Sequence, residues 1–444
     1  MKNSFCCSPW FHIGINPEGV YLPCRWSRDI RTASILKESL THNMRDMSLI
    51  DFMNSDQMKA LRLEFLNGVS PKMCRTCVYE DSHSKVSGRQ RQLLKSGFTI
   101  GNFDKTFCAS PHYDWFEHSQ NNEGHTNTMP VDLQIELGNT CNSGCIMCSP
   151  IYSSKLASDY KKLHLVEPTL FPSYAPFKNW ADDPTLVDKF ISDLEQIPNI
   201  RYIHFLGGET LYLKSFYAIC ERLIQSGLAK NISMGTTTNC TIYTPELEYI
   251  IRNFKHVHLG LSIESFHPIN DYIRHPSQID SVTENIHKFL ALREETGMHL
   301  ALRISPSVLS IFYLDTVFKF MIEHSITAES CDILTEPSCL RMELIPDNIR
   351  EICLSKINAV IDDYNLERST STIVNRRNDS VLNDVISELV YEYRDFLLHY
   401  HRPPNVEADR NNLVKFLKSF ESIRGNNILD YLPEYEKFLR LYGY

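Results

Sequence analysis

Short apolar segments alternate with amphipathic segments between residues 131 and 345 of the chain. Six apolar segments have the length and composition of buried strands, at residues 131–137, 201–206, 231–236, 257–263, 300–305 and 331–334. Between them, apolar positions recur three and four residues apart, which predicts helices at residues 186–197, 213–227, 245–254, 281–295 and 314–325. Such alternation predicts parallel strands joined by right-handed crossovers. We therefore expect an α/β fold in which residues 131–345 form a partial (β/α)6 TIM-like barrel, with its chemistry at the C-terminal ends of the strands.

The sequence pattern outside residues 131–345 predicts three further parts of the molecule. Residues 1–90 form a small module with a β-hairpin that turns at the Asn-Pro-Glu-Gly segment 16–19. Residues 91–130 are a loop-rich connector, and residues 346–444 are a helical extension without recognisable chemistry. The long segment 149–182, rich in aromatic residues and prolines, follows the first barrel strand and is either a lid over the barrel mouth or a surface excursion.

Composition and charge exclude some classes of protein. Hydrophobic residues make up 43% of the 444 residues, but no stretch approaches the roughly 20 apolar residues of a membrane span. The first residues also lack the apolar core of a signal peptide. We therefore expect a soluble, cytoplasmic protein without a membrane partner. The net charge of −9 argues against a nucleic-acid partner, because a phosphate backbone attracts basic surfaces.

The cysteines are numerous and unevenly placed. Clustered thiols in a reducing compartment indicate metal or redox chemistry rather than disulfides. Cys141, Cys145 and Cys148 follow the first barrel strand with the spacing C-x3-C-x2-C. Four thiolates would indicate a closed zinc site, whereas three indicate a cluster with one iron that lacks a protein ligand and is open to a cofactor. The alternative is a zinc site that takes its fourth ligand from a distant part of the chain.

The cysteine spacing, together with its place after the first strand of a barrel, resembles the radical S-adenosylmethionine (radical SAM) enzymes. The resemblance covers roughly residues 131–345 and implies that Cys141, Cys145 and Cys148 bind a 4Fe–4S cluster. In this family the cluster binds S-adenosylmethionine (SAM) and cleaves it reductively to a 5′-deoxyadenosyl radical, which abstracts hydrogen from a substrate. The resemblance also implies an electron donor such as flavodoxin or ferredoxin.

Further motifs at the ends of the second and third predicted strands fit the same family. Gly207, Gly208 and Glu209 resemble its glycine-rich motif. Glycines allow the backbone to approach a cofactor closely, and the carboxylate of Glu209 is implied to accept from the ammonium group of SAM. Thr210 stands where the family usually has proline. Asn239, in a segment that resembles the ribose-contacting one, is implied to bind the ribose.

The later strands supply the remaining implied contacts to SAM. Ser262 resembles the serine that contacts the ribose, and Glu264 occupies a position where the family often has aspartate. Arg274 resembles the arginine that pairs with the carboxylate of SAM, a task that suits a planar guanidinium. Pro306 lies in a segment implied to contact the adenine. Met147 replaces the aromatic residue often found before the third cysteine and is expected to cover the edge of the adenine.

A second group of cysteines lies near the N-terminus. Cys6-x12-Gly19-x4-Cys24, followed much later by Cys74-x2-Cys77, resembles the half-length auxiliary-cluster module of radical SAM enzymes, called a twitch or SPASM-like domain. The resemblance implies a second, auxiliary 4Fe–4S cluster held by these four cysteines. This module more often follows the barrel, whereas here it precedes it, so its docking stays open.

The ligands and the metal of this module also stay open. Cys7 or Cys108 is an alternative ligand, and a structural zinc knuckle is the alternative to an iron–sulfur cluster. Next to the module, the basic segment 84–95 is either a solvated helix face or a docking patch for an acidic reductant or peptide.

The resemblance implies an enzyme but leaves its substrate open. Radical SAM enzymes with this auxiliary module commonly modify peptides or proteins, so we expect oxidative crosslinking, dehydrogenation or epimerisation of a peptide. A thiol of Cys331 or Cys339 is a candidate hydrogen donor for an epimerisation, against the alternative of ordinary buried thiols. The other hypotheses are a radical SAM enzyme that acts on a small molecule, such as a carbohydrate or antibiotic precursor, and a non-catalytic iron–sulfur or zinc protein.

Overall fold

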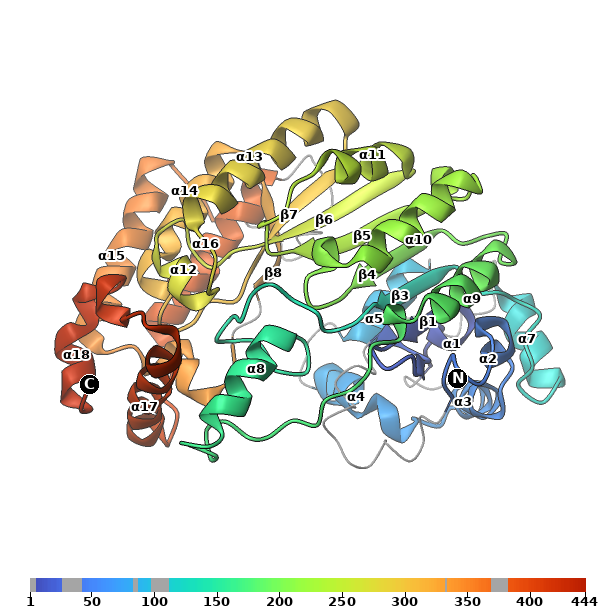
Figure 1. The fold of residues 1–444 in the computed structure, drawn as a ribbon, viewed down its shortest axis with the longest axis horizontal. Coiled ribbons are helices and arrows are strands. Elements are labelled where there is room, and N and C mark those ends of the chain that lie inside the picture. The colour runs from blue at the N-terminus through green and yellow to red at the C-terminus, as the bar shows by residue number, and fades with distance from the viewer. Residues whose placement is uncertain (1–4, 26–41, 83–86, 97–111, 332–333, 369–381) are drawn as a thin grey trace.

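The fold is built around one large sheet. The structure, a computed structural model, describes residues 5–25, 42–82, 87–96, 112–331, 334–368 and 382–444. Within these residues the sheet has eight strands in the order β2-β1-β3-β4-β5-β6-β7-β8 (Figure 1). Its barrel strands are β3 (Asp132–Glu136), β4 (Tyr202–Leu206), β5 (Ser233–Thr238), β6 (His256–Ser262), β7 (His299–Ile304) and β8 (Thr327–Cys331). All neighbouring pairs from β3 to β8 are parallel, which confirms the predicted partial barrel.

The sixth barrel strand is the one that was predicted wrongly. The apolar residues at 331–334 suggested the strand, but it ends at Cys331 and starts at Thr327. The chain turns at Ser325, whose φ is 48°, and then pairs with β7 from Ala301 onwards. Residues 332–333 lie outside the described residues. The strand is therefore determined by pairing with β7, and it is more polar than the apolar segment that the hydrophobic pattern suggested.

The predicted helices between the strands are confirmed and cover one face of the sheet (Figure 1). They are α9 (Pro184–Glu195), α10 (Lys214–Gln225), α11 (Pro245–Asn253), α13 (Ile279–Thr296) and α14 (Leu314–Glu323). Two begin with proline at their first position after a capping side chain: Asp183 accepts from the Thr185 amide, and Thr244 from the Leu247 amide. These caps define the residue at which each of the two helices begins.

Strand alternation separates an apolar outer face of the barrel from a polar inner face. On β4, Ile203 and Phe205 are fully buried, and the Phe205 ring contacts that of Phe216 on α10 at 5.5 Å between centroids. Tyr202 and His204 point to the opposite face and stay partly exposed. The inner face is therefore able to contact a polar substrate.

The N-terminal hairpin is part of the same sheet. β1 (His12–Ile15) pairs in antiparallel fashion with β2 (Tyr21–Leu22) and in parallel with β3. The Asn16 side chain accepts from the amides of Glu18 and Val20, both at 2.9 Å, and Gly19 adopts a φ of 86°. The predicted hairpin and its turn are thus confirmed, and the module docks by extending the barrel sheet beyond β3.

Several helices complete the N-terminal part: α1 (Ser8–Phe11), α2 (Leu49–Met53), α3 (Asp56–Leu66), α4 (Arg75–Ser82), α5 (Gly88–Lys95) and α7 (Tyr113–Asn121). They enclose the fully buried guanidinium of Arg62, which donates to the carbonyls of Pro9, Met53 and Gly124. One side chain therefore ties α1, α2 and the segment after α7 together.

The predicted C-terminal extension is confirmed as helical, with α15 (Asp347–Asp363), α16 (Leu382–His399), α17 (Val406–Arg424) and α18 (Glu436–Leu441). The long segment after β3 contains α8 (Ser154–Leu163), and α17 packs against it. The Phe171 ring stacks on that of Phe416 at 5.3 Å between centroids. The C-terminal extension therefore packs against part of this segment, through α8 and Phe171, while the predicted domain boundaries stay a prediction.

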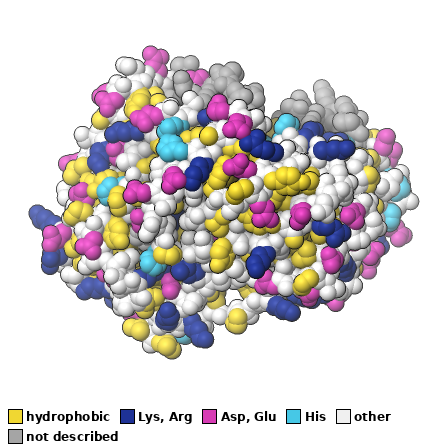
Figure 2. Space-filling view, turned by 45° about the horizontal axis from the view of Figure 1, so that its top comes forward, with side chains coloured by type: hydrophobic (Ala, Val, Ile, Leu, Met, Phe, Trp, Pro, Cys, Tyr) yellow, Lys and Arg dark blue, Asp and Glu magenta, His cyan; other side chains and the backbone are white. Residues whose placement is uncertain are grey.

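The surface gives no simple guide to a partner. On the face seen in Figure 2, acidic and basic side chains are interspersed, and neither sign forms a continuous field. No helix within the described part of the chain is both long and apolar enough to cross a bilayer.

Candidate functional site

The loop with three cysteines lies between β3 and α8, and its backbone is held on both sides. The amide of Gly144 donates to the carbonyl of His275 at 2.8 Å, and that of Ile146 to Ile273 at 2.9 Å. From the other side, the Ser153 hydroxyl donates to the carbonyl of Ser143 at 2.7 Å. These bonds connect the loop to α12 (Ile269–Ile273) and to the start of α8, so the loop has a defined shape.

The three thiols converge but do not form a site for a single ion. Burial, together with the neighbouring Cys145 and Cys148 thiols, raises the pKa of Cys141 to about 12. Within the described residues, no group of three or more His, Cys, Asp or Glu side chains is placed to hold one metal ion. A zinc ion needs all its ligands at about 2.1–2.3 Å, whereas a cubane binds each cysteine to a different iron and so accepts wider spacing. Three thiolates on one short loop are a ligand set that suits a cubane with one iron left open.

The glycine-rich motif at the end of β4 packs directly against this loop. A Cβ atom on Gly208 would lie 2.4 Å from the carbonyl oxygen of Thr140 and 2.5 Å from that of Asn139. The Glu209 amide donates to the Thr140 carbonyl at 3.1 Å. A Cβ on Gly207 would instead meet the end of the Leu213 side chain at 2.7 Å. Gly208 is thus required by the entry to the cysteine loop, a reason that the sequence did not reveal.

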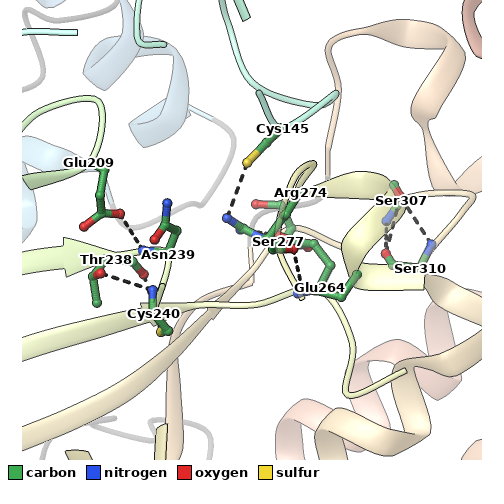
Figure 3. A network of polar contacts seen from close by, with 12 residues as sticks. Cys145, Glu209, Thr238, Asn239, Cys240, Glu264, Arg274, Ser277, Ser307 and Ser310 are labelled. Carbon is green, nitrogen blue, oxygen red and sulfur yellow. Dashed lines mark hydrogen bonds and ion pairs between the residues drawn. The ribbon is translucent and has the colours of Figure 1, made fainter. Parts of the chain in front are cut away.

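Glu209 and Asn239 lie side by side next to the cysteine loop (Figure 3). The Glu209 carboxylate accepts from the amides of Leu211 at 3.1 Å and Asn239 at 2.7 Å. Burial raises the pKa of Glu209 to about 7, although these hydrogen bonds oppose the shift. The Asn239 side chain donates to Asn142 at 2.8 Å and Ser143 at 2.9 Å, both in the cysteine loop. This network joins the ends of β4 and β5 to the loop.

Arg274, whose side chain is 12% exposed, pairs with the buried Glu264 beside Cys145 (Figure 3). The guanidinium lies 2.5 Å from the Glu264 carboxylate and donates to the Cys145 sulfur at 3.8 Å. The other oxygen of Glu264 accepts from the Ser305 amide at 2.9 Å. Burial raises the pKa of Glu264, while the charge of Arg274 lowers it. Arg274 therefore connects β6 and the segment after β7 to the cysteine loop.

The other predicted SAM contacts reach the same edge of the sheet. Ser262 is the last residue of β6 and is paired in register with Arg303, while Pro306 is buried two residues after β7 ends. Met147, within the cysteine loop, is half-buried against the core. The individual roles of these residues stay predictions. Sequence reasoning missed the loop residues Asn142 and Ser143, whose side chains carry much of the network.

The N-terminal cysteines meet at one cavity. Its lining includes the four predicted ligands, together with apolar side chains and Arg89: Cys6, Cys24, Cys74, Cys77, Pro9, Pro23, Leu61, Phe65 and Met73. Burial, together with the Cys24 and Cys77 thiols, raises the pKa of Cys74 to about 12. Four thiols in electrostatic contact around one mostly apolar cavity fit an auxiliary cluster.

The alternative ligand Cys7 is not among the residues that line this cavity. Its thiol donates to the Ser96 hydroxyl at 3.4 Å and faces the Gln92 carbonyl at 3.8 Å. Cys108 lies outside the described residues. Arg89, expected on a solvated basic face, instead lines the cavity and pairs with Asp81, whereas Arg91 is exposed.

Comparison with protein families agrees with this geometry. Residues 135–302 match the radical SAM superfamily, and residues 6–78 match the iron–sulfur cluster-binding domain called SPASM. The chain thus carries a radical SAM domain at residues 135–302 and a SPASM domain at residues 6–78, on the N-terminal side of its barrel. Its cofactors are accordingly SAM and a 4Fe–4S cluster, with an auxiliary iron–sulfur cluster in the SPASM domain.

Similar solved structures are distant. The structure of Streptococcus suis SuiB bound to SAM is 13% identical over 70% of this chain and 64% of that chain, with a TM-score of 0.32. SuiB bound to its precursor peptide SuiA is 13% identical over 62% and 55%, with a TM-score of 0.32. Native anSMEcpe with bound SAM is 12% identical over 53% and 61%, with a TM-score of 0.35. The chain thus spans less than two thirds of each, and no curated protein sequence matches it.

Proposed function

We propose that this protein is a radical SAM enzyme that abstracts hydrogen from a peptide or protein substrate and completes an oxidative modification. The observation that carries this proposal is the polar network that joins the ends of β4, β5 and β6 to the cysteine loop, through Glu209, Asn239 and Arg274. A zinc knuckle or a passive cluster protein needs no buried carboxylate and guanidinium beside its thiols, because burying such charges is costly.

Each residue of the network has a role in holding SAM in this proposal. Cys141, Cys145 and Cys148 would hold the 4Fe–4S cluster, which supplies the one-electron cleavage of SAM. The Glu209 carboxylate, 2% exposed, would accept from the ammonium of SAM. Arg274 would pair with the carboxylate of SAM. Its guanidinium would then contact two carboxylates, that of Glu264 and that of SAM. Burial of these groups excludes water from the reacting atoms.

The N-terminal module supports an oxidative outcome. Its four cysteines would hold the auxiliary cluster in an apolar cavity, and its hairpin shares a sheet with the barrel. A redox centre fixed to the edge of the barrel would be the acceptor for an electron from the substrate radical. Crosslinking and dehydrogenation both require such an acceptor. Epimerisation through the Cys339 thiol has less support, because this residue is only 3% exposed. The side chain of Cys331, the other candidate donor, lies outside the described residues.

The SPASM domain supports a peptide substrate, because radical SAM enzymes with such a module commonly modify peptides or proteins. The polar inner face of the barrel is compatible with a small polar molecule as well. His204, His258 and His299 lie at one level of the sheet, since His204 and His258 both pair with Gly235 and His258 pairs with His299. A small-molecule substrate therefore stays the second candidate.

The test is anaerobic reconstitution followed by reduction with dithionite in the presence of SAM. We expect formation of 5′-deoxyadenosine that depends on both reagents and is lost in Cys145→Ala. Candidate peptides, deuterated at their Cα or Cβ positions, would transfer deuterium into 5′-deoxyadenosine if they are substrates. Absence of 5′-deoxyadenosine from a chain that carries iron would exclude the enzyme and favour a non-catalytic iron–sulfur protein.

A further inference from the structure

Arg424, the last residue of α17, turns its guanidinium into the protein rather than into solvent. Its side chain is only 3% exposed, and the guanidinium lies 4.3 Å from the centroid of the Phe420 ring. The helix ends directly after it, at Gly425, which has a φ of 71°. Arg424 lies beyond both segments that match known families, residues 6–78 and 135–302.

The guanidinium of Arg424 joins the C-terminal extension to the cysteine loop. One nitrogen donates to the carbonyl oxygen of Gly144 at 2.6 Å and to the Asp159 carboxylate at 2.7 Å. The Nε atom also donates to Asp159, at 3.2 Å. Gly144 stands directly before Cys145, and Asp159 lies on α8, directly after the loop. A single side chain thus fixes the middle of the loop from a position 280 residues away.

The loop has room for this guanidinium because residue 144 is glycine. A Cβ atom there would lie 3.0 Å from the Arg424 nitrogen, closer than ordinary side-chain contacts. The Gly144 amide is held from the opposite side by the carbonyl of His275. The backbone amide and the backbone carbonyl of Gly144 are therefore both hydrogen-bonded. These two bonds fix the position of the adjoining Cys145 backbone.

The contact also adds positive charge beside the thiols. Arg274 and Arg424 both act electrostatically on Cys145, and each has one carboxylate partner, Glu264 and Asp159 respectively. Lys155 on α8 adds a further positive charge near His275. The carboxylates of Glu264, Asp159 and Glu209 face the same surroundings, so the cations and anions around the loop balance, and loss of one cation leaves the thiols in a net negative environment.

We propose that Arg424 is a positioning residue for the radical SAM cluster, which fixes the cysteine loop through Gly144 and stabilises the reduced state of the cluster by its charge. The inference rests on the proposed ligands Cys141, Cys145 and Cys148. Reduction adds one electron to the cluster, so a nearby buried cation raises the midpoint potential and its removal lowers it. The C-terminal helices are then part of the cluster site rather than only a packing layer.

The test compares Arg424→Met, which removes the charge, with Arg424→Lys, which keeps it but loses the planar fork. An anaerobic redox titration would follow the EPR signal that responds to SAM, since that signal identifies the radical SAM cluster. We expect a more negative midpoint potential in Arg424→Met and a potential close to wild type in Arg424→Lys. Both variants are expected to bind less iron at this site, because the loop is held less firmly.

Arg410→Met is the matched control. Arg410 lies on the same helix, is 6% exposed and donates to the carbonyls of Leu344 and Ile345, away from the loop. Its loss disturbs α17 without touching Gly144, so the potential should stay at the wild-type value. Equal shifts in Arg410→Met and Arg424→Met would reduce the role of Arg424 to helix packing and overturn the inference.

Hydrogen exchange of the metal-free chain keeps the inference testable if Arg424→Met does not fold. In Arg424→Lys, the amides of Gly144 and Ile146 should exchange several-fold faster than in wild type, and in Arg410→Met they should not. Unchanged exchange in Arg424→Lys would overturn the positioning role. A wild-type chain without a SAM-responsive signal overturns the proposed function, whereas a wild-type signal that Arg424→Met leaves at the same potential overturns this inference alone.

Discussion

The two glycines that follow β4 face very different surroundings. A Cβ on Gly208 would meet the backbone carbonyls of Thr140 and Asn139, which cannot move without distorting the cysteine loop. A Cβ on Gly207 would meet only the end of the Leu213 side chain, which can rotate. The first contact is rigid and the second is adaptable, so the two positions should respond differently to the same substitution.

We therefore expect Gly208→Ala to reduce the iron bound at the radical SAM site severalfold, and Gly207→Ala to leave it near the wild-type level. Iron and sulfide analysis after anaerobic reconstitution measures both. The destabilisation of Gly208→Ala should be about 1–3 kcal/mol, typical of overpacking. Equal iron content in the two variants would contradict the assignment of the Gly208 contact.

Glu209, the proposed partner of the SAM ammonium group, should make SAM binding depend on pH. Burial raises the pKa of its carboxyl to about 7, above the usual value of 4.5, so the ligand-free fold favours the protonated form. The stability gained from this preference is complete below the unfolded pKa and is lost as the pH rises through about 7. The deprotonated form, which attracts an ammonium group, grows over the same range.

The affinity for SAM should therefore increase about fivefold as the pH rises from about 6 to about 7, because the ionised fraction of Glu209 increases by that factor while the ammonium group of SAM stays mostly protonated. Glu209→Gln should bind SAM more weakly and lose most of this dependence. Equilibrium binding across this pH range, with the metal-free and loaded chains in parallel, measures it. A Glu209→Gln variant that keeps the wild-type slope would assign the pH dependence to another group.

At the scale of elements, the N-terminal module brings four cysteines to one cavity, whereas Cys7 is not part of its lining and hydrogen-bonds to Ser96. We expect Cys24→Ala to lose about four irons per chain, the content of one cubane, and Cys7→Ala to lose none. The two variants share the same chemical change, so Cys7→Ala is the control for general damage to the module. Loss of iron in Cys7→Ala, with full iron in Cys24→Ala, would reverse the ligand assignment.

Elements with strong local patterns were predictable, and those set by distant contacts were not. The first five barrel strands and the crossover helices follow from hydrophobic periodicity, which is a property of neighbouring residues. β8 did not, because pairing with β7 selects the polar segment Thr327–Cys331 over the more apolar residues that follow. The hairpin was predictable from its turn, but its parallel pairing with β3 was not.

The candidate site divides in the same way. The cysteine motifs are local in sequence, so they were visible without a structure, and the family resemblance supplied the expected roles of Glu209 and Arg274. The Arg424 contact joins residues 280 apart and has no sequence signature. The same is true of the Asn239 bonds to Asn142 and Ser143, since any polar residues at those positions give similar patterns.

At the scale of the whole molecule, the SPASM domain and the barrel share one sheet. β3 pairs with β1 on one side and β4 on the other, and Arg25 forms an ion pair with Asp132 of β3 at 2.7 Å. Removal of residues 1–78 would leave β3 as an exposed edge and uncover apolar side chains of Leu133 and Ile135.

We therefore expect a chain without residues 1–78 to melt several degrees lower than the full chain and to aggregate, even when the radical SAM cysteines are intact. Thermal unfolding of both chains, in the metal-free form, measures this. Cys24→Ala is the matched control, because it removes an auxiliary ligand but keeps β1 in place. A truncated chain that melts like the full chain would show that the barrel does not depend on β1.

The central claim is that Cys141, Cys145 and Cys148 hold a 4Fe–4S cluster with one iron free to bind SAM. The most direct measurement is the EPR spectrum of the reduced, anaerobically reconstituted chain, recorded with and without SAM. We predict a change in the spectrum on addition of SAM that is absent in Cys145→Ala, in a wild-type chain with about eight irons. An unchanged spectrum, or zinc bound at these three cysteines, would contradict the account.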